Sequence, residues 1–216
     1  MIENILPAIY LLASAGFILA VKWMNHPSTA RRGVIIGEIG MVLAVLGTLL
    51  RAEANLHLIF LGLAIGGAIG IPLAYKTPMT AVPQLTALSH AFGAVASALI
   101  GTAEFYEKAP TGFTMAALGT ETLLGFLTTT ASIIAFAKLQ ELMPTRPLTY
   151  PGQNFVSLGT GAAAVVLIVM MVMGMSAPWM FPTFIALALA FGILLVIPIG
   201  GADMPTVIAL LNSYAG

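Results

Sequence analysis

The chain has 216 residues, of which 59% are hydrophobic and only 7% are charged, whereas soluble domains usually carry about 25% charged residues. This composition excludes a soluble globular protein. Eight Lys and Arg residues balance eight Asp and Glu residues, so the chain lacks the positive excess that neutralises phosphates, and nucleic acid is excluded as a partner. The absence of cysteine excludes disulfides, thiolate metal sites and cysteine nucleophiles.

Long apolar segments follow one another along the whole chain. A helix needs about 20 mainly apolar residues to cross the hydrocarbon core of a bilayer, and Pro, Gly, Asn or charged residues separate segments of that length. In chain order, the predicted spans are 4–21, 34–50, 57–75, 84–103, 114–137, 155–176 and 179–199. We therefore expect an all-α, polytopic bundle of transmembrane helices in the lipid bilayer.

An eighth helix is predicted to begin near Met204 and Pro205, because proline suits the first turn of a helix. The sequence stops at Gly216, which leaves this helix too short to cross a bilayer. We thus expect seven spans and the start of an eighth, forming one transmembrane domain over residues 1–216 that is truncated at its C-terminal end.

The positive residues predict how the helices are oriented in the membrane. When loops are assigned to alternate sides, six Lys and Arg residues fall on one side and two on the other. The six are Lys22, Arg31, Arg32, Lys76, Lys138 and Arg146, and the two are Arg51 and Lys108. Positive residues are enriched in cytoplasmic loops, so the six are expected in the cytoplasm and the N-terminus outside. Glu3, rather than a positive residue, precedes the first apolar segment, which argues against a cleaved signal peptide.

His90 is the strongest functional candidate inside a predicted span. A charged group at the centre of a membrane helix costs about 2.5–3.5 kcal/mol on insertion scales, so an ionisable residue there indicates function. At helical spacing, Thr86, Gly93, Ala94 and Ser97 share the face of His90, and this polar face could line a hydrated interior. An imidazole takes up and releases protons near neutral pH. The alternative is a neutral histidine hydrogen-bonded to a neighbouring helix.

Glu121 begins a second polar stripe, in the fifth predicted span. The stripe continues at helical spacing through Gly125, Thr128, Thr129 and Ser132, which makes this span a candidate neighbour of the fourth. Glu121 lies within about two turns of the outer end of the span and could instead reach the membrane interface. Glu38, in the second span, is interpreted as an ion-paired or interfacial glutamate.

The last segment holds further polar candidates. Asp203 precedes the short eighth helix, where free amides and the helix dipole favour a carboxylate, so an N-cap role is sufficient to explain it. Asn212 lies nearly three turns further on, about 13 Å at 1.5 Å per residue, where a buried amide needs partners. No pair of His, Asp or Glu has metal-ligand spacing, and no Ser-His-Asp pattern indicates hydrolysis.

Four segments resemble the beta subunit of the proton-translocating NAD(P) transhydrogenase, in its membrane domain. They are IGGAIGIPLAYK at 65–76, MTAVPQLTALSH at 79–90, AFAKL at 135–139 and IGGADMPTVIALLNSYAG at 199–216. The last is the most specific, because so long a string is unlikely to recur by chance. Together with the pattern of spans, the resemblance covers essentially the whole chain.

The resemblance implies a dimeric enzyme of the bacterial inner membrane that couples hydride transfer from NADH to NADP+ with inward proton movement. It implies that His90 is the proton relay, Asn212 its hydrogen-bonding partner, and Asp203 a coupling residue near the NADP(H)-binding domain. Glu121 falls where the family often has glutamate. With Thr86, Ser97 and Ser213, it completes the set of candidate pathway residues.

The rest of the family's beta subunit, including its NADP(H)-binding domain, does not follow in this sequence. The chain itself is therefore expected to bind no cofactor or metal, with NADP(H) and NAD(H) held by the complete enzyme. Its expected partners are the alpha subunit with its membrane helices, the NADP(H)-binding domain and a second copy of the complex. Two other classes stay open: a proton- or cation-coupled secondary transporter that uses His90, Glu38 and Glu121, and a structural subunit in which these residues only join helices.

Overall fold

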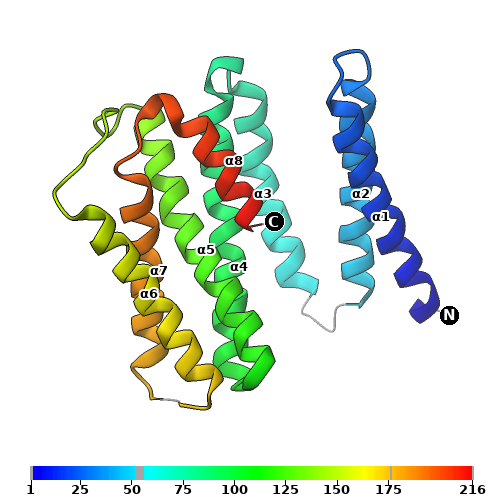
Figure 1. Ribbon diagram of the computed structural model, residues 1–216. Coiled ribbons are helices and arrows are strands. Elements are labelled where there is room, and N and C mark those ends of the chain that lie inside the picture. Colours follow the sequence, from blue (N-terminus) through cyan, green and yellow to red (C-terminus); the bar gives the residue numbers. More distant parts are fainter. Residues whose placement is uncertain (1, 52–55, 176, 216) are drawn as a thin grey trace. The chain divides into compact units, whose positions relative to one another are not determined.

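The computed structural model describes residues 2–51, 56–175 and 177–215, and every regular element in those ranges is a helix (Figure 1). The α-helices are α1 (Ile2–Met24), α2 (Ala30–Arg51), α3 (Leu56–Lys76), α4 (Val82–Lys108), α5 (Gly112–Leu139), α6 (Gln153–Val172), α7 (Met180–Val196) and α8 (Met204–Ala215). Two short 3₁₀ helices, η1 (Met79–Ala81) and η2 (Gly201–Asp203), precede α4 and α8. The predicted all-α fold is confirmed.

The predicted order of membrane spans is also confirmed in outline. Helices α1 to α6 are each long and apolar enough to cross a membrane. The seventh predicted span corresponds to α7, which has only 17 residues and forms with α8 a pair bent by 108° at the break between them. The eighth helix begins at Met204, as predicted. The predicted end of the sixth span at residue 176 and the chain end at Gly216 lie outside the described residues.

The chain divides into two compact units, residues 1–76 and residues 77–216. The first unit contains α1 to α3, and the second contains α4 to α8. Every residue that the sequence predicts for the proton pathway or for coupling lies in the second unit.

In the first unit, α1 and α2 pack against each other through small residues. A Cβ atom at Gly33 would lie 2.8 Å from the carbonyl oxygen of Ala20, and one at Gly40 would lie 3.1 Å from that of Ala13. Small residues of this kind let two membrane helices approach closely. Glu38 of α2 is exposed and forms no ion pair with any residue that the structure describes, so its interfacial interpretation is favoured over the ion-paired one.

Helix α5 is the centre of the second unit. It packs against α4, α6, α7 and α8, and Figure 1 shows it between α4 and α7. One apolar cluster joins α5 to α7 and α8 and includes Leu127, Val196 and Leu211. A second joins α5 to α6 and α7 and includes Met115 and Phe184. This arrangement buries the polar stripe of α5 from Gly125 to Ser132, whereas Glu121, at its outer end, is exposed.

Candidate functional site

Helices α4 and α5 pack closely through small residues. Five buried residues of α4 form this contact face: Ala87, Ala91, Ala94, Ala98 and Gly101. A Cβ atom at Gly125 of α5 would lie 2.8 Å from the Cβ of Ala98, and one at Gly101 would collide with Oγ1 of Thr122. The prediction that the fifth span is the neighbour of the fourth is thus confirmed.

Two pairs near the ends of this interface fix its antiparallel register. They are Gly101 with Thr122, and Gln84 with Leu139, whose carbonyl oxygen accepts a hydrogen bond of 3.0 Å from the Gln84 Nε2. A residue one position later in α4 therefore lies at the level of a residue one position earlier in α5. This register places His90 within one residue of the level of Ser132.

His90 lies at the edge of the α4–α5 interface, next to the buried Ala91. The residue as a whole is half-buried, but its Nε2 atom is fully buried and has no hydrogen-bond partner among the described residues. A buried nitrogen without a partner costs about 1–3 kcal/mol. Such a group is normally satisfied by an ordered water molecule or a proton when the site is polar enough to hold one.

The polar stripe of α5 supplies further unpartnered atoms at this interface. Thr122, Thr128 and Ser132 are fully buried, and none of their hydroxyl groups makes a hydrogen bond to a described residue. Two neighbouring threonines behave differently: Thr129 donates to the carbonyl oxygen of Gly125, and Thr130 donates to that of Leu189, both at 2.8 Å. With Nε2 of His90, helices α4 and α5 therefore bury four polar atoms that have no hydrogen-bond partner among the described residues.

Ser97 and Glu121 join the two predicted stripes directly. The Ser97 hydroxyl of α4 donates a hydrogen bond of 3.1 Å to Oε1 of Glu121 on α5. Ser97 is half-buried, whereas Glu121 is exposed. The sequence predicts both as pathway residues, and the structure brings them together.

Thr86 lies further from the buried face of α4 than the sequence predicts. It is exposed, and its hydroxyl donates to the carbonyl oxygen of Val82 within the same helix. Gly93 is also exposed, and only Ala94 of the predicted stripe is fully buried. The polar stripe of α4 thus follows the edge of the interface, because the neighbouring alanines occupy its centre.

Helix α8 packs against α4 and α5, but Asn212 and Ser213 lie on its exposed side. Its buried residues are Met204, Val207, Ile208 and Leu211. Asn212 is exposed, and the exposed Ser213 donates to the carbonyl oxygen of Leu210 in its own helix. In the described part of the chain, no hydrogen bond joins Asn212 to His90. The pairing of these two residues stays a prediction.

Asp203 is exposed at the end of η2, immediately before α8. Its backbone N–H donates to the carbonyl oxygen of Gly200, at 3.1 Å. Asp203 lines a hollow of about 570 Å³ that is also lined by Lys138, Glu141, Arg146 and Gly201. Acidic and basic side chains therefore meet in the hollow beside the α7–α8 bend.

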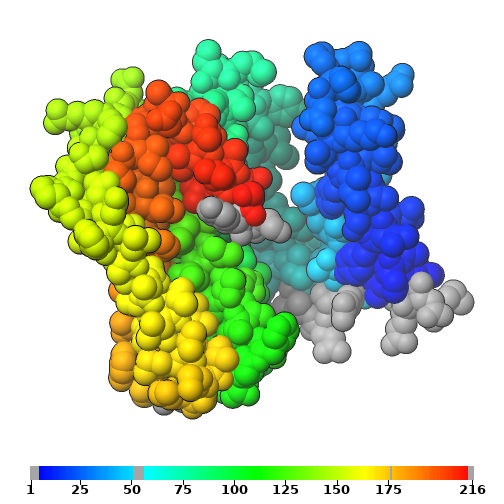
Figure 2. Space-filling view, viewed as in Figure 1, coloured from blue at the N-terminus to red at the C-terminus, as the bar shows by residue number. Residues whose placement is uncertain are grey.

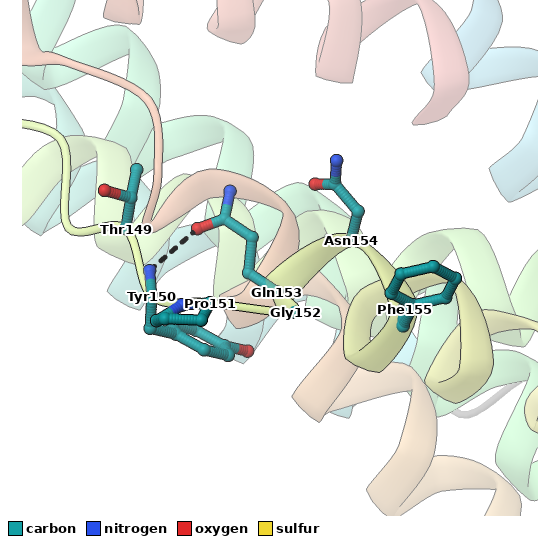
Figure 3. A pocket seen from close by; sticks show the side chains of 7 residues that line it. All are labelled: Thr149, Tyr150, Pro151, Gly152, Gln153, Asn154 and Phe155. Carbon is teal, nitrogen blue, oxygen red and sulfur yellow. Dashed lines mark hydrogen bonds between the residues drawn. The ribbon is translucent and has the colours of Figure 1, made fainter.

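A second hollow, of about 500 Å³, lies at the start of α6 and is lined by residues 149–155. Figure 3 shows the Gln153 side chain directed back toward Tyr150, whose backbone N–H donates to Gln153 Oε1 at 3.2 Å. None of the predicted site residues lines this hollow. It is a feature of the loop that leads into α6.

The comparison with known protein families decides the relationship of this chain. Residues 6–216 match the family model described as NAD(P) transhydrogenase beta subunit. The chain belongs to the NAD(P) transhydrogenase beta subunit family. Two proteins of Rhodospirillum rubrum, both called NAD(P) transhydrogenase subunit beta, are each 41% identical to it over 226 aligned residues. The match covers 100% of this chain and 48% of each relative, so the chain spans about half the length of the curated relatives it matches.

Membership of the beta subunit family confirms the resemblance seen in the sequence. It also favours a transhydrogenase over the secondary transporter and the purely structural subunit. Sequence reasoning identified the stripe that holds Thr128 and Ser132, but it missed the unpartnered Thr122 and treated Lys138 only as a loop charge. In the structure, Lys138 belongs to the last turn of α5 and is fully buried. Its position at the end of an apolar span was the one available signal.

Proposed function

We propose that this chain is the membrane part of a proton-translocating NAD(P) transhydrogenase and that His90 takes up and releases the translocated protons. The observation that carries the proposal is the buried, unpartnered Nε2 of His90, which the α4–α5 register places within one residue of the level of Ser132, whose hydroxyl is also buried and unpartnered. A neutral imidazole accepts a proton at one nitrogen, and a hydroxyl both donates and accepts hydrogen bonds. Water between these groups would complete a chain along which a proton can move.

The proposed path runs along the α4–α5 interface. Ser97 and Glu121 stand toward the predicted outer end and are joined by their hydrogen bond. The unpartnered hydroxyls of Thr122 and Thr128 follow along α5 toward the level of His90. Thr86 lies between His90 and the predicted cytoplasmic end of α4. Protons would therefore pass His90 on their way from the outer side to the cytoplasm.

We assign the control of this path to α8. Asn212 directly follows the buried Leu211, so a rotation of α8 about its own axis would turn the amide toward His90 and let it hydrogen-bond one state of the imidazole. Asp203 would transmit the position of the NADP(H)-binding domain to α8. Ser213, the next residue after Asn212, would rotate with it.

Hydride transfer is proposed to take place outside this chain. A dinucleotide-binding fold needs parallel strands with a glycine-rich turn, and the ranges that the structure describes contain helices alone. NAD(H) and NADP(H) would therefore bind to the other domains of the complete enzyme. The proposed partners are the alpha subunit with its membrane helices, the NADP(H)-binding domain and a second copy of the complex.

The proposed location is the bacterial inner membrane, with the N-terminus outside. The six-to-two distribution of Lys and Arg residues between the two sides supports this orientation.

The proposal is tested by replacing His90 with Ala in the complete enzyme and measuring hydride transfer and vesicle acidification together. Loss of a general acid–base group typically slows proton transfer by roughly 100-fold or more, so we expect acidification to be abolished. His26→Ala is the matched control, because His26 is exposed in the loop between α1 and α2 and its replacement should leave both rates unchanged. Normal acidification by the His90→Ala enzyme would refute the relay.

A further inference from the structure

Lys138 is a buried lysine that the proposed proton path does not use. Its side chain is fully buried in the last turn of α5. The Nζ atom donates hydrogen bonds to the carbonyl oxygens of Ile197, at 2.5 Å, and Ile199, at 2.6 Å. It forms no ion pair with a carboxylate of the described residues. Among the described residues, two backbone carbonyl groups accept the hydrogen bonds of this buried ammonium group.

The two carbonyl groups lie where α7 ends and the chain bends toward α8. The last carbonyl groups of a helix have no partner within the helix and carry the negative end of its dipole. Pro198 lacks an N–H group, so the regular hydrogen bonds cannot continue through the bend. A cation at this position donates to both carbonyl groups and also offsets the negative end of the helix dipole. Figure 2 shows the bend from α7 (orange) into α8 (red) at the surface of the second unit.

The loop that follows α5 is attached to the same bend. The backbone N–H of Gly201 donates to the carbonyl oxygen of Thr145, at 2.8 Å, and that of Leu148 donates to the carbonyl oxygen of Ile197, at 3.3 Å. A Cβ atom at Gly201 would lie only 3.2 Å from the Cβ of Thr145. We call the contacts of Lys138, Ile197, Ile199, Thr145 and Gly201 the Lys138 joint.

The Lys138 joint lies between Asp203, the proposed coupling residue, and the part of α5 that carries Ser132 of the proposed proton path. Asp203 lies four residues after Ile199, and α8 begins immediately after Asp203. On the other side, α5 carries Ser132 fewer than two turns before Lys138. A displacement of Asp203 that moves α8 against α5 is therefore opposed by the contacts of the joint, which hold the preceding residues Ile197 and Ile199 to α5.

We propose that Lys138 is a positioning residue that fixes the α7–α8 bend to α5 and thereby sets the position of α8 at the His90 interface. Its effect on proton movement rests on the proposed function. An ammonium group buried away from these carbonyl groups would carry a large desolvation penalty, so the charge holds the joint in one geometry. Without the charge, the bend keeps its apolar contacts and its hydrogen bonds to the loop after α5 but loses both hydrogen bonds to the α5 side chain, so the position of α8 against α5 becomes less well defined.

The geometric part is tested by a distance measurement in the complete enzyme. This chain contains no cysteine, so spin labels on cysteines introduced at the exposed Gln140 and Ala202, with cysteines elsewhere in the enzyme removed, report the span across the joint. We expect Lys138→Met to broaden or shift the distance distribution and Lys138→Arg to preserve it. Lys108→Met is the matched control, because Lys108 is exposed and its ion pair is with Glu104 of its own helix. An unchanged distribution in Lys138→Met would overturn the assignment.

The functional part is tested by the number of protons moved per hydride transferred in vesicles. We expect this ratio to fall by at least about fivefold in Lys138→Met, the lower end of typical coupling effects, and to recover in Lys138→Arg. A residue that only stabilises the fold would lower both rates together and leave the ratio unchanged, and that result in a correctly assembled variant would contradict the coupling role.

If Lys138→Met does not accumulate in membranes, Lys138→Gln replaces it. The glutamine side chain is shorter and uncharged and cannot reach both carbonyl groups, so the same two outcomes decide the question. The distance measurement does not depend on proton movement. An unmodified enzyme that moves no protons would therefore refute the proposed function while leaving the joint to be judged by its geometry.

Discussion

The α4–α5 interface near His90 and the Lys138 joint both bury polar groups, but they satisfy them in opposite ways. At the joint, the buried ammonium group donates to two carbonyl oxygens and the nearby backbone N–H of Gly201 has its own acceptor. At the interface, the Nε2 of His90 and the hydroxyls of Thr122, Thr128 and Ser132 are buried without a partner among the described residues. The two regions are connected, because both involve α5.

The difference separates polar groups that hold the fold together from polar groups that are free to exchange partners. A satisfied group is costly to disturb, since breaking its bonds leaves a buried charge or carbonyl group exposed to an apolar environment. An unsatisfied group can gain a water molecule or a proton without losing a protein contact. Proton movement therefore belongs to the interface, and mechanical attachment belongs to the joint.

The largest expected effect comes from forcing α4 and α5 apart. Gly125→Leu places a branched side chain where even a Cβ atom would lie 2.8 Å from the Cβ of Ala98, and overpacking of this kind costs about 1–3 kcal/mol or more. We expect a lower thermal unfolding temperature of the complex and loss of proton movement. Gly93→Leu is the matched control, because a Cβ built at Gly93 would have no described neighbour within 4 Å apart from the adjacent residues and the backbone of its own helix. Equal effects of the two variants would show that the close helix contact is not required.

An intermediate effect is expected from two hydroxyl deletions on α5 that should act in opposite ways. Ser132→Ala removes an unpartnered hydroxyl, so stability should be unchanged or higher while proton movement falls about tenfold, less than the roughly 100-fold or greater loss expected for His90. Thr130→Val removes the hydrogen bond to Leu189 and should cost about 1 kcal/mol of stability with an unchanged ratio of protons to hydride. Thermal unfolding and vesicle acidification are measured on both variants, and each variant should lower one of the two and not the other. A loss of proton movement in Thr130→Val alone would contradict the distinction between satisfied and unsatisfied polar groups.

The smallest effect is expected at the outer end of the interface. Ser97→Ala removes the hydrogen bond to Glu121, but Glu121 is exposed, and solvent can replace the lost donor. We expect proton movement to fall by less than in Ser132→Ala and the unfolding temperature to stay the same. If Ser97→Ala proved as damaging as Ser132→Ala, the exposed end rather than the buried part would control the path.

Much of the fold could be predicted from the sequence because membrane spans are local features. A stretch of apolar residues needs no information from the rest of the chain to form a helix in a bilayer, and the helix start at Met204 follows from the adjacent proline. The pairing of α4 with α5 was also predictable, since both carry polar and small residues at helical spacing. The exposed position of Thr86 was not, because a helical stripe can lie at the centre or at the edge of a contact.

The family, the order of the helices and the residues that can carry protons could all be recognised in the sequence. Which of these residues have hydrogen-bond partners depends on how the helices pack. The bonds of Lys138 span 59 and 61 residues, and no local pattern indicates that a lysine at the end of one helix satisfies the end of another. Likewise, Leu211 and Asn212 are adjacent in the sequence, yet packing against α4 and α5 buries Leu211 and leaves Asn212 exposed. Hydropathy and residue spacing are local features of the sequence. Whether a buried polar group has a hydrogen-bond partner depends instead on which helices come into contact in the fold.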